Sequence, residues 1–514
     1  MTPVGGVPPV RTKRSERGTS RRTLSMTIRS AGLATLVQYA ASLILAPVVF
    51  AGASVATFGA WATISSILAI GALADAGLRL EISRRVADAA GEGNDSRVRS
   101  AVHEGTTLLM VVAGVTVIVG CVVTPLIRSF ALPQGIPGMT AGEIDLFLRL
   151  TFVLLGASLL ADGYFAVLRG LQRADVENHS RLIGVVVGTV TAIIGIELGW
   201  SLWALLAGAA AQDLTAIALQ AIATRRVVPE LRFRVPSLRG TAWRGMLSLS
   251  GMALVSQISD VVDSQWDKVM LSRYVGSTAV AGFQIGTTLS LQAKAIALLP
   301  AAPLLVAIAE LRRRNPAQAR RVLDVLCSAT FAIGAVTLSG LVVFAPPFLH
   351  LWLGRDLPSA VASARLFTVA VACNLLAAPL AYRALGEARH RLTAIASLTN
   401  IGVNAILSYV LTVTIGLKGP LYGSIAGNAI GTALFFLLMR RALGPDWRWP
   451  SWRAPAIGVT AAILGLLLGF DRVSSWPALI ARALLFCVVV GAAACAAERI
   501  PVRTLLRRRL GASV

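Results

Sequence analysis

Residues 246–283 read MLSLSGMALVSQISDVVDSQWDKVMLSRYVGSTAVAGF, two apolar runs that enclose a short charged stretch. With 100° between successive residues of an α-helix, four polar side chains fall on one line, namely Ser256, Asp260, Asp263 and Asp267. A carboxylate that faces lipid costs about 3 kcal/mol, so Asp260 and Asp263 are expected to face other helices or water. We therefore predict that this helix borders a hydrated interior, and that Asp267 and Lys268 end the membrane span at its interface.

The composition of the whole chain explains why lipid is the relevant surrounding. The 514 residues are 55% hydrophobic and only 14% charged, whereas soluble domains carry about 25% charged residues. Apolar runs of about 20 residues, which suffice to cross roughly 30 Å of hydrocarbon, recur along the chain. We predict an all-α integral membrane protein with about 14 spans. The spans are residues 30–50, 55–77, 105–127, 147–168, 182–199, 201–222, 245–266, 278–302, 326–346, 364–383, 393–413, 419–439, 455–470 and 475–497.

The net charge of +23 is distributed unevenly between the predicted loops. With these spans, 38 of the 48 Lys and Arg residues lie on the side of both termini, nine lie on the other side, and Lys294 lies within a span. Because basic residues accumulate in cytoplasmic loops, we expect both termini in the cytoplasm. Membrane topology thus accounts for the basic charge, and we expect no nucleic-acid partner.

No motif for metal, cofactor or ATP chemistry stands out. The five Cys residues all lie in predicted spans without a C-x-x-C pair, and the four His residues are scattered. The chain contains no GxxxxGK[ST] loop and no HExxH motif. We therefore predict no metal, no cofactor, no catalytic residues and no enzyme activity. The first apolar run is too long for a signal-peptide core, so it is expected to remain as the first helix.

Three pairs of segments indicate an internal duplication with an offset near 220 residues. GASVATFGAW (52–61) corresponds to GSTAVAGFQI (276–285), LRGLQRADVENHSRL (168–182) to YRALGEARHRL (382–392), and GWSLWALLAGAA (199–210) to GPLYGSIAGNAI (419–430). Parallel repeats are typical of transporters, whose sites lie where the halves meet. We predict a basic tail (1–29), a first six-helix lobe (30–222), a cytoplasmic linker (223–244), a second six-helix lobe (245–440), two extra helices (441–497) and a basic tail (498–514).

Several segments resemble one family of membrane proteins. FGAWATISSILAIGALADAGLRLEISRRVADAAGEGN (58–94) is similar to the second span and first cytoplasmic loop of polysaccharide flippases, which carry a D-x-G-L turn. QWDKVMLSRYVGSTAVAGFQIG (265–286) is similar to their Asp-Lys signature before the eighth span, and FLHLWLGRDLPSA (348–360) and GEARHRL (386–392) resemble two further motifs. Over about residues 30–440 the chain thus resembles the lipid-linked oligosaccharide (O-antigen-like) flippases of the MATE/MOP superfamily.

This resemblance implies 12 or 14 helices in two lobes around a central cavity, in the inner membrane of a bacterium. It also implies that an undecaprenyl-diphosphate-linked oligosaccharide is moved from the inner to the outer leaflet by alternating access. The expected partners are this lipid-linked oligosaccharide, membrane lipids, a coupling H⁺ or Na⁺, and other membrane proteins of polysaccharide assembly.

Polar side chains within the spans are the candidates for the substrate path. Gln284, Thr287 and Lys294 follow helical spacing on the eighth span, and they join Asp260 and Asp263 of the seventh. An ammonium within a span needs a counter-charge. For Lys294 this is either the diphosphate of the substrate or a structural ion pair with Asp260, Asp213 or Asp162. Arg29, at the entrance of the first span, and Arg79, after the second span, are weaker candidates, because juxtamembrane arginines usually anchor against lipid phosphate.

Other polar residues within the spans have separate expected roles. Asp162 and Asp213 are candidates for the uptake of a coupling ion, whereas Asp75 is expected to cap the end of its span. Asn400 and Asn404, one turn apart, are expected to form interhelical hydrogen bonds rather than to contact substrate.

Three alternatives stay open. A MATE-type drug or metabolite exporter would need an apolar pocket with a carboxylate for its cation, and a lipid II flippase would move a related substrate. A membrane glycan polymerase would need a catalytic carboxylate or Arg cluster on a long outer loop. The longest predicted outer loop, residues 128–145, offers only Arg128, Glu143 and Asp145.

Overall fold

The computed structural model describes residues 21–75, 77–227, 261, 265–299, 316–386, 389–444, 449 and 451–498. Throughout these ranges the regular elements are helices, and no strand occurs. Ten of the described helices are long and apolar enough to cross a membrane, and α2 (Val55–Gly71) and α16 (Arg453–Leu467) are shorter apolar helices. The predicted all-α, multi-pass membrane architecture is therefore confirmed. The chain divides into two compact units, residues 1–261 and 262–514.

The described helices of the first unit follow the order of its six predicted spans. The charged segment between the second and third spans forms a helix of its own, α3. The elements are α1 (Arg21–Gly52), α2, the 3-10 turn η1 (Ala72–Asp75), α3 (Leu78–Gly91), α4 (Asp95–Ala131), α5 (Ala141–Gly170), α6 (Ala174–Glu197) and α7 (Leu202–Val227).

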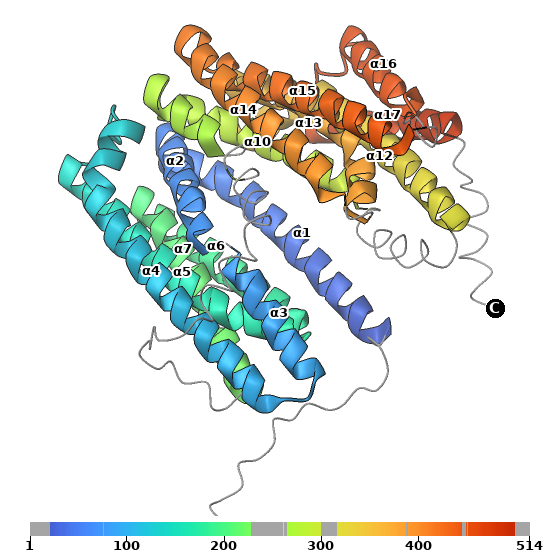
Figure 1. The fold of residues 1–514 in the computed structure, drawn as a ribbon. Helices are drawn as coiled ribbons and strands as arrows, with labels where there is room; N and C mark the ends of the chain where they lie inside the picture. Colours follow the sequence, from blue (N-terminus) through green and yellow to red (C-terminus); the bar gives the residue numbers. More distant parts are fainter. Residues whose placement is uncertain are drawn as a thin grey trace, which may run out of the picture. The chain divides into compact units, whose positions relative to one another are not determined.

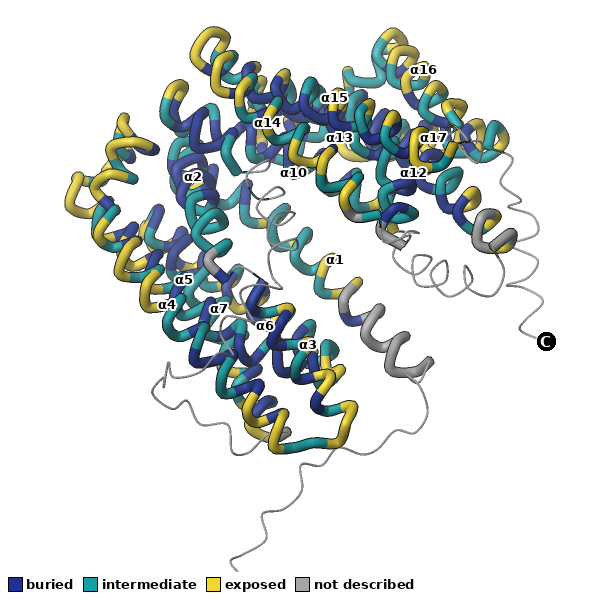
Figure 2. Tube along the Cα trace, in the orientation of Figure 1, coloured by how far each residue is buried: buried dark blue, intermediate teal, exposed yellow. Residues whose placement is uncertain are grey.

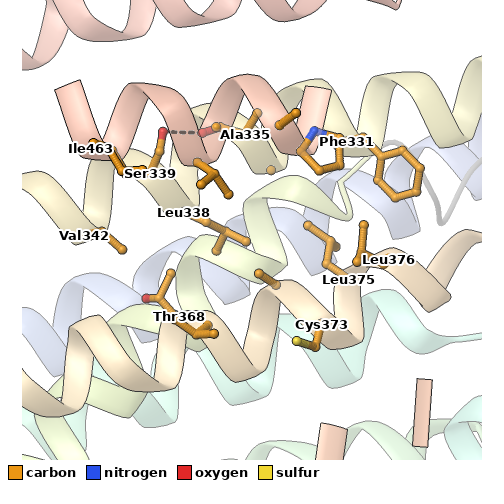
Figure 3. Close-up of a pocket in the computed structure, with 18 of the residues that line it drawn as sticks. Phe331, Ala335, Leu338, Ser339, Val342, Thr368, Cys373, Leu375, Leu376 and Ile463 are labelled. Atoms are coloured by element: carbon orange, nitrogen blue, oxygen red, sulfur yellow. Dashed lines mark hydrogen bonds between the residues drawn. The ribbon is translucent and has the colours of Figure 1, made fainter. Parts of the chain in front are cut away.

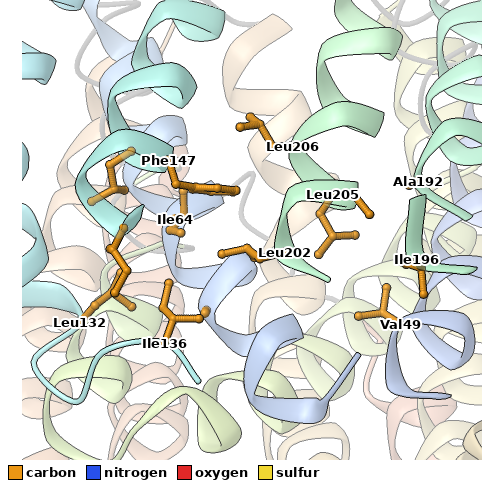
Figure 4. Packing of buried hydrophobic residues seen from close by; sticks show 14 residues of the cluster. Val49, Ile64, Leu132, Ile136, Phe147, Ala192, Ile196, Leu202, Leu205 and Leu206 are labelled. Carbon is orange, nitrogen blue, oxygen red and sulfur yellow. The ribbon is translucent and has the colours of Figure 1, made fainter. Parts of the chain in front are cut away.

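One apolar core joins α1, α2, α5, α6 and α7 (Figure 4). Phe147 of α5 is fully buried at its centre, and its ring packs edge-on against Trp203 of α7, with 5.1 Å between ring centroids. Leu132 and Ile136, from the loop between α4 and α5, belong to the same core (Figure 4). The longest predicted outer loop therefore folds back into the bundle.

The outer face of α4 is apolar and exposed (Figure 2). Five residues at helical spacing are each more than half exposed: Val115, Ile118, Val119, Val122 and Leu126. In water such a continuous apolar stripe would be unfavourable, whereas in a bilayer it contacts lipid while the backbone remains hydrogen-bonded within the helix. The exposed surface of this unit thus fits a membrane-spanning bundle.

The second unit begins, in its described part, with a helix over residues 265–274. It continues with α10 (Ser277–Ala297), α12 (Pro316–Leu353), α13 (Pro358–Gly386), α14 (His390–Ile415), α15 (Lys418–Leu443), α16 and α17 (Trp476–Ala497).

The same helix pairs pack in both units, as the predicted duplication requires (Figure 1). In the first unit α4 packs on α5, α5 on α7 and α6 on α7; in the second α12 packs on α13, α13 on α15 and α14 on α15. Small residues bring the last pair of each unit together. A Cβ atom added at Gly188 of α6 would lie 2.6 Å from the carbonyl oxygen of Gly208, and one added at Gly423 of α15 would lie 2.7 Å from the backbone nitrogen of Ser408. Such glycines let membrane helices approach closely.

The C-terminal pair α16–α17 packs on α12. At one end, the carboxylate of Glu498 accepts hydrogen bonds from Ser328 of α12 (3.0 Å) and from Ser451 (2.7 Å) ahead of α16. At the other end, Arg365 of α13 pairs with Asp471 at 3.3 Å. Polar contacts at both ends therefore hold the extra pair against the second unit.

Arg365 also satisfies a carbonyl that a proline leaves without its helical partner. Pro346 of α12 has no N–H group, so the carbonyl of Val342, four residues earlier, receives no hydrogen bond within the helix. The Nε atom of Arg365 donates to this oxygen at 3.0 Å. An unsatisfied carbonyl inside a membrane protein would be costly, so Arg365 stabilises α12 next to Pro346.

Asp267 and Lys268 lie within a described helix over residues 265–274, so this helix does not end at them. Asp267 is only 1% exposed. Most of the predicted seventh span, residues 245–266, lies outside the described residues, and the interfacial position of Asp267 and Lys268 stays a prediction. The eighth span, α10, is long enough but too polar to be among the ten apolar helices, since Gln284, Gln292 and Lys294 interrupt its apolar sequence.

Candidate functional site

The first unit holds a partly buried cluster of charges formed by Asp75, Arg79 and Asp162. The Nη2 atom of Arg79 donates to Asp75 Oδ2 at 3.0 Å and to Asp162 Oδ2 at 2.6 Å. Its Nε atom also donates to Asp75 at 3.2 Å. One guanidinium is thus shared by two carboxylates, which leaves an excess of one negative charge in the cluster when both are ionised.

The D-x-G-L turn of the sequence builds one side of this cluster. Gly77 has a φ of +77°, a conformation that favours glycine. The Oδ1 atom of Asp75 accepts the backbone N–H of Gly77 at 3.1 Å, while its Oδ2 atom holds Arg79 one helical turn later. Asp75 therefore holds the turn that leads from η1 into α3 and orients Arg79 toward Asp162 of α5, and its expected role as a cap of its span stays a prediction.

Aromatic and ionic contacts extend the cluster along α5. The guanidinium carbons of Arg79 and Arg169 lie 4.9 Å and 4.5 Å from the centroid of the Phe165 ring. Arg169 in turn pairs with Glu177 of α6 at 3.0 Å. These contacts join α3, which lies in the segment that resembles the family's first cytoplasmic loop, to α5 and α6.

The two predicted ion-coupling residues, Asp162 and Asp213, both lie at one face of α5. Asp162 belongs to this helix, and Ser158, one turn earlier, donates its hydroxyl to Asp213 Oδ2 of α7 at 2.6 Å. Because Ser158 and Asp162 are four residues apart, Asp213 and the Arg79 cluster lie along the same side of α5. Arg79 and Ser158, which bind these two acids, both belong to the first unit, and the role of the acids in coupling stays a prediction.

On α10 the structure separates a packing face from a more open face. Gly282, Gly286 and Ser290 face α13, where the Ser290 hydroxyl lies 3.0 Å from that of Thr368. Gln284 lies on a different side of the helix and donates to Thr288 at 2.9 Å. Thr287 is buried and donates back to the carbonyl of Phe283 at 2.7 Å, so its hydroxyl is engaged within its own helix.

The remaining predicted site residues are less fully described. Lys294 is half-buried on the last turn of α10. Arg29 lies on α1, but its side chain is outside the described residues, as are Asp260 and Asp263 altogether. The predicted polar line on the seventh helix therefore stays a prediction.

The sequence analysis missed the polar contacts of Asp267. The Ser424 hydroxyl of α15 lies 3.2 Å from Asp267 Oδ2 and 3.4 Å from Asn404 Oδ1 of α14. Ser408 donates to the same Asn404 oxygen at 2.8 Å. The interhelical hydrogen bonding expected of Asn404 is present, and small polar residues at four-residue spacing were the available signal for it.

The candidates on the outer loop have structural partners. Arg128 pairs with Asp145 at 2.8 Å, which joins the end of α4 to the start of α5. Glu143 and Thr140 form a capping box at the N-terminus of α5, because each side chain binds the backbone N–H of the other residue. These contacts give all three charged residues of the loop a role in the fold.

The second unit contains an apolar groove and a small polar cavity. The groove, of about 570 Å³, lies between α12, α13 and α16 (Figure 3). The cavity, of about 120 Å³, lies between α13, α14 and α15.

Solved structures of membrane transporters have a fold similar to that of this chain. A lipid II flippase, MurJ, in an inward closed conformation, superposes with a TM-score of 0.68 at 12% identity, covering 96% of this chain and 100% of its own. An inward-facing multidrug resistance MATE transporter of the MOP superfamily superposes with a TM-score of 0.60 at 17% identity, covering 82% and 97%. A MOP superfamily transporter from Pyrococcus furiosus gives 0.53 at 16% identity, covering 82% and 95%.

These structures establish a shared MOP-type fold. No curated protein sequence matches the chain. The family described as "Polysaccharide biosynthesis protein" matches residues 27–306, more than half of the chain. The protein therefore belongs to the polysaccharide biosynthesis protein family.

Proposed function

We propose that this protein is a flippase that moves a polyprenyl-diphosphate-linked oligosaccharide from the inner to the outer leaflet of a bacterial inner membrane for surface polysaccharide export. The family and the MOP-type fold support a transport role in polysaccharide assembly. An alternating-access route suits such a substrate, because each unpaired polar group of its sugar-diphosphate head would cost about 2–7 kcal/mol in bare hydrocarbon.

The observation that carries the proposal is the apolar groove between α12, α13 and α16 (Figure 3). Leu338, Leu375 and Leu376 line it together with residues of α16, and no charged residue does. Its two hydroxyl groups bond to their own helices: Ser339 donates to the carbonyl of Ala335, and Thr368 to that of Ala364. The surface offered to a ligand is therefore hydrocarbon, which suits an isoprenoid chain.

A cation-coupled drug exporter is the second candidate. It would need a carboxylate within the ligand pocket, and neither the groove nor the polar cavity has an acidic residue among its lining.

The diphosphate head of the flippase substrate needs a positive partner, and we assign this role to Lys294. Asp162 and Asp213 are the proposed sites for H⁺ or Na⁺ uptake, both termini are proposed to be cytoplasmic, and the two lobes are proposed to enclose the path.

Deletion of the gene tests the proposal. We expect lipid-linked oligosaccharide to accumulate in the cytoplasmic leaflet, where enzymes added to intact spheroplasts cannot reach it, together with loss of the surface glycan. A Leu338→Trp variant, which fills the groove, should fail to restore export although it is inserted normally, whereas the exposed Leu484→Trp of α17 should restore it. Normal surface glycan with new sensitivity to cationic dyes would support the exporter instead.

A further inference from the structure

The polar cavity of the second unit has a chemistry that differs from that of the apolar groove. Its volume is about 120 Å³. Three amide and three hydroxyl side chains line it, namely Asn374, Asn400, Asn428, Thr393, Ser397 and Thr432. The remaining lining consists of alanines, Gly431 and the ring of Phe435, and no charged side chain takes part.

Close packing of α14 on α15 fixes Asn400 at this cavity. A Cβ atom added at Gly427 would lie 2.6 Å from Asn400 Oδ1, and one added at Gly431 would lie 2.9 Å from Asn400 Cβ. The two glycines therefore create the space that the asparagine occupies. Asn400 Oδ1 is nevertheless buried and accepts no hydrogen bond in the described part of the chain. Buried amide oxygens rarely lack a donor, and no described residue supplies one to this atom, so unused acceptor capacity remains beside the cavity.

Neighbouring side chains also leave acceptor capacity at the cavity. Asn428 donates its amide to the carbonyl of Ser424 at 2.9 Å, and Thr432 donates its hydroxyl to the carbonyl of Cys373 at 3.0 Å. One amide hydrogen of Asn428 and the hydroxyl hydrogen of Thr432 are thereby used within the protein, while the side-chain oxygen atoms keep lone pairs for a ligand. A fitting ligand must supply several O–H or N–H donors.

We infer that this cavity binds one neutral sugar unit of the transported glycan, an inference that rests on the proposed function. A single ordered water needs roughly 10–15 Å³ of such space, so the cavity admits a much larger polar group. Sugar hydroxyls both donate and accept, as amides do, and the alanine methyl groups with Phe435 suit the C–H face of a pyranose ring. Without a cationic side chain the cavity disfavours the diphosphate, and without a carboxylate it disfavours a cationic drug.

Direct binding of simple glycosides tests the inference. The probes are neutral methyl glycosides of glucose, galactose, mannose and rhamnose, each added to the full-length protein in lipid nanodiscs. Binding is followed by saturation-transfer difference NMR. We expect at least one glycoside to bind, and we expect Asn400→Leu to weaken its binding by tenfold or more. Inorganic pyrophosphate should not compete.

A matched pair of variants on α14 separates loss of the site from loss of the fold. Thr393→Val removes a hydroxyl of the cavity, whereas Thr399→Val removes one that is bonded to the carbonyl of Ile395 and does not line the cavity. Only the first should weaken binding. Unchanged binding in both Asn400→Leu and Thr393→Val would overturn the site, as would the absence of any glycoside binding, which would mean a cavity filled by water alone.

The flipping assay keeps the two proposals apart. If glycosides do not bind while the wild type moves lipid-linked oligosaccharide, the sugar site is wrong and the proposed function stands. If a glycoside binds through Asn400 but no lipid-linked oligosaccharide is moved, the sugar site stands and the proposed function is wrong.

Discussion

Replacement of Arg79 by Gln removes the one cation shared by Asp75 and Asp162. The side chain of Asp75 is 2% exposed and that of Asp162 is 19% exposed, so both carboxylates would be left without compensation in a poorly hydrated place. Removal of one partner from a fully buried pair costs about 3–5 kcal/mol. Because Arg79 is itself 37% exposed, solvent screening lowers the value, and we expect a loss of about 2 kcal/mol in the free energy of unfolding.

The assay is reversible unfolding in mixed micelles with rising sodium dodecyl sulfate, followed by tryptophan fluorescence. Arg84→Gln is the control on the same helix, because Arg84 is 52% exposed and pairs with Glu81; it should cost no more than about 1 kcal/mol. Arg79→Gln combined with Asp162→Asn should lose less than the sum of the single variants, with a coupling of about 1–2 kcal/mol. Equal losses for the two arginine variants, or strict additivity, would refute the shared-cation account.

Three further predictions concern other parts of the chain. Arg365→Ala should lower the free energy of unfolding by about 1–3 kcal/mol, because the carbonyl of Val342 then loses its hydrogen-bond donor. Arg365→Lys should recover part of this free energy in the same assay. Burial raises the pKa of Glu81, but hydrogen bonds from its two arginine neighbours outweigh this and hold the pKa below its ordinary value. The stabilisation by Glu81 is therefore full above about pH 5 and is lost as pH falls through the lowered pKa, so the stability gap to Glu81→Gln should close in acid; a constant gap would contradict it. Lys294→Ala should abolish complementation although the protein reaches the membrane, and full activity would remove Lys294 from the mechanism.

The positions of the membrane helices could be predicted because lipid imposes one strong constraint, about 20 apolar residues per crossing. Their ends could not be predicted equally well. α4 begins at Asp95, ten residues before the predicted span at 105, because its first turns are polar and lie outside the hydropathy signal. The local signal was Asn94, whose side chain caps the helix by accepting the N–H of Arg97. Capping residues thus indicate where a helix begins when its first turns are too polar to be found by hydropathy.

The charged residues show where single-sequence reasoning ends. The four-residue spacing of Asp75 and Arg79 was a signal for their ion pair that the sequence analysis did not use. The second partner, Asp162, is 83 residues away in sequence, and the packing of α3 on α5 brings it to Arg79. The contact of Asp267 with Ser424 of α15 likewise joins residues 157 positions apart in the sequence.

Transport itself gives the most direct test of the central claim. The purified protein is placed in proteoliposomes that carry the host's lipid-linked oligosaccharide in both leaflets, and a glycosidase that cannot cross the membrane is added outside. Without the protein about half of the oligosaccharide should stay protected. We expect the wild type to make the protected half accessible within minutes, and we expect Leu338→Trp to leave it protected. Protection that persists with correctly inserted wild-type protein would contradict it.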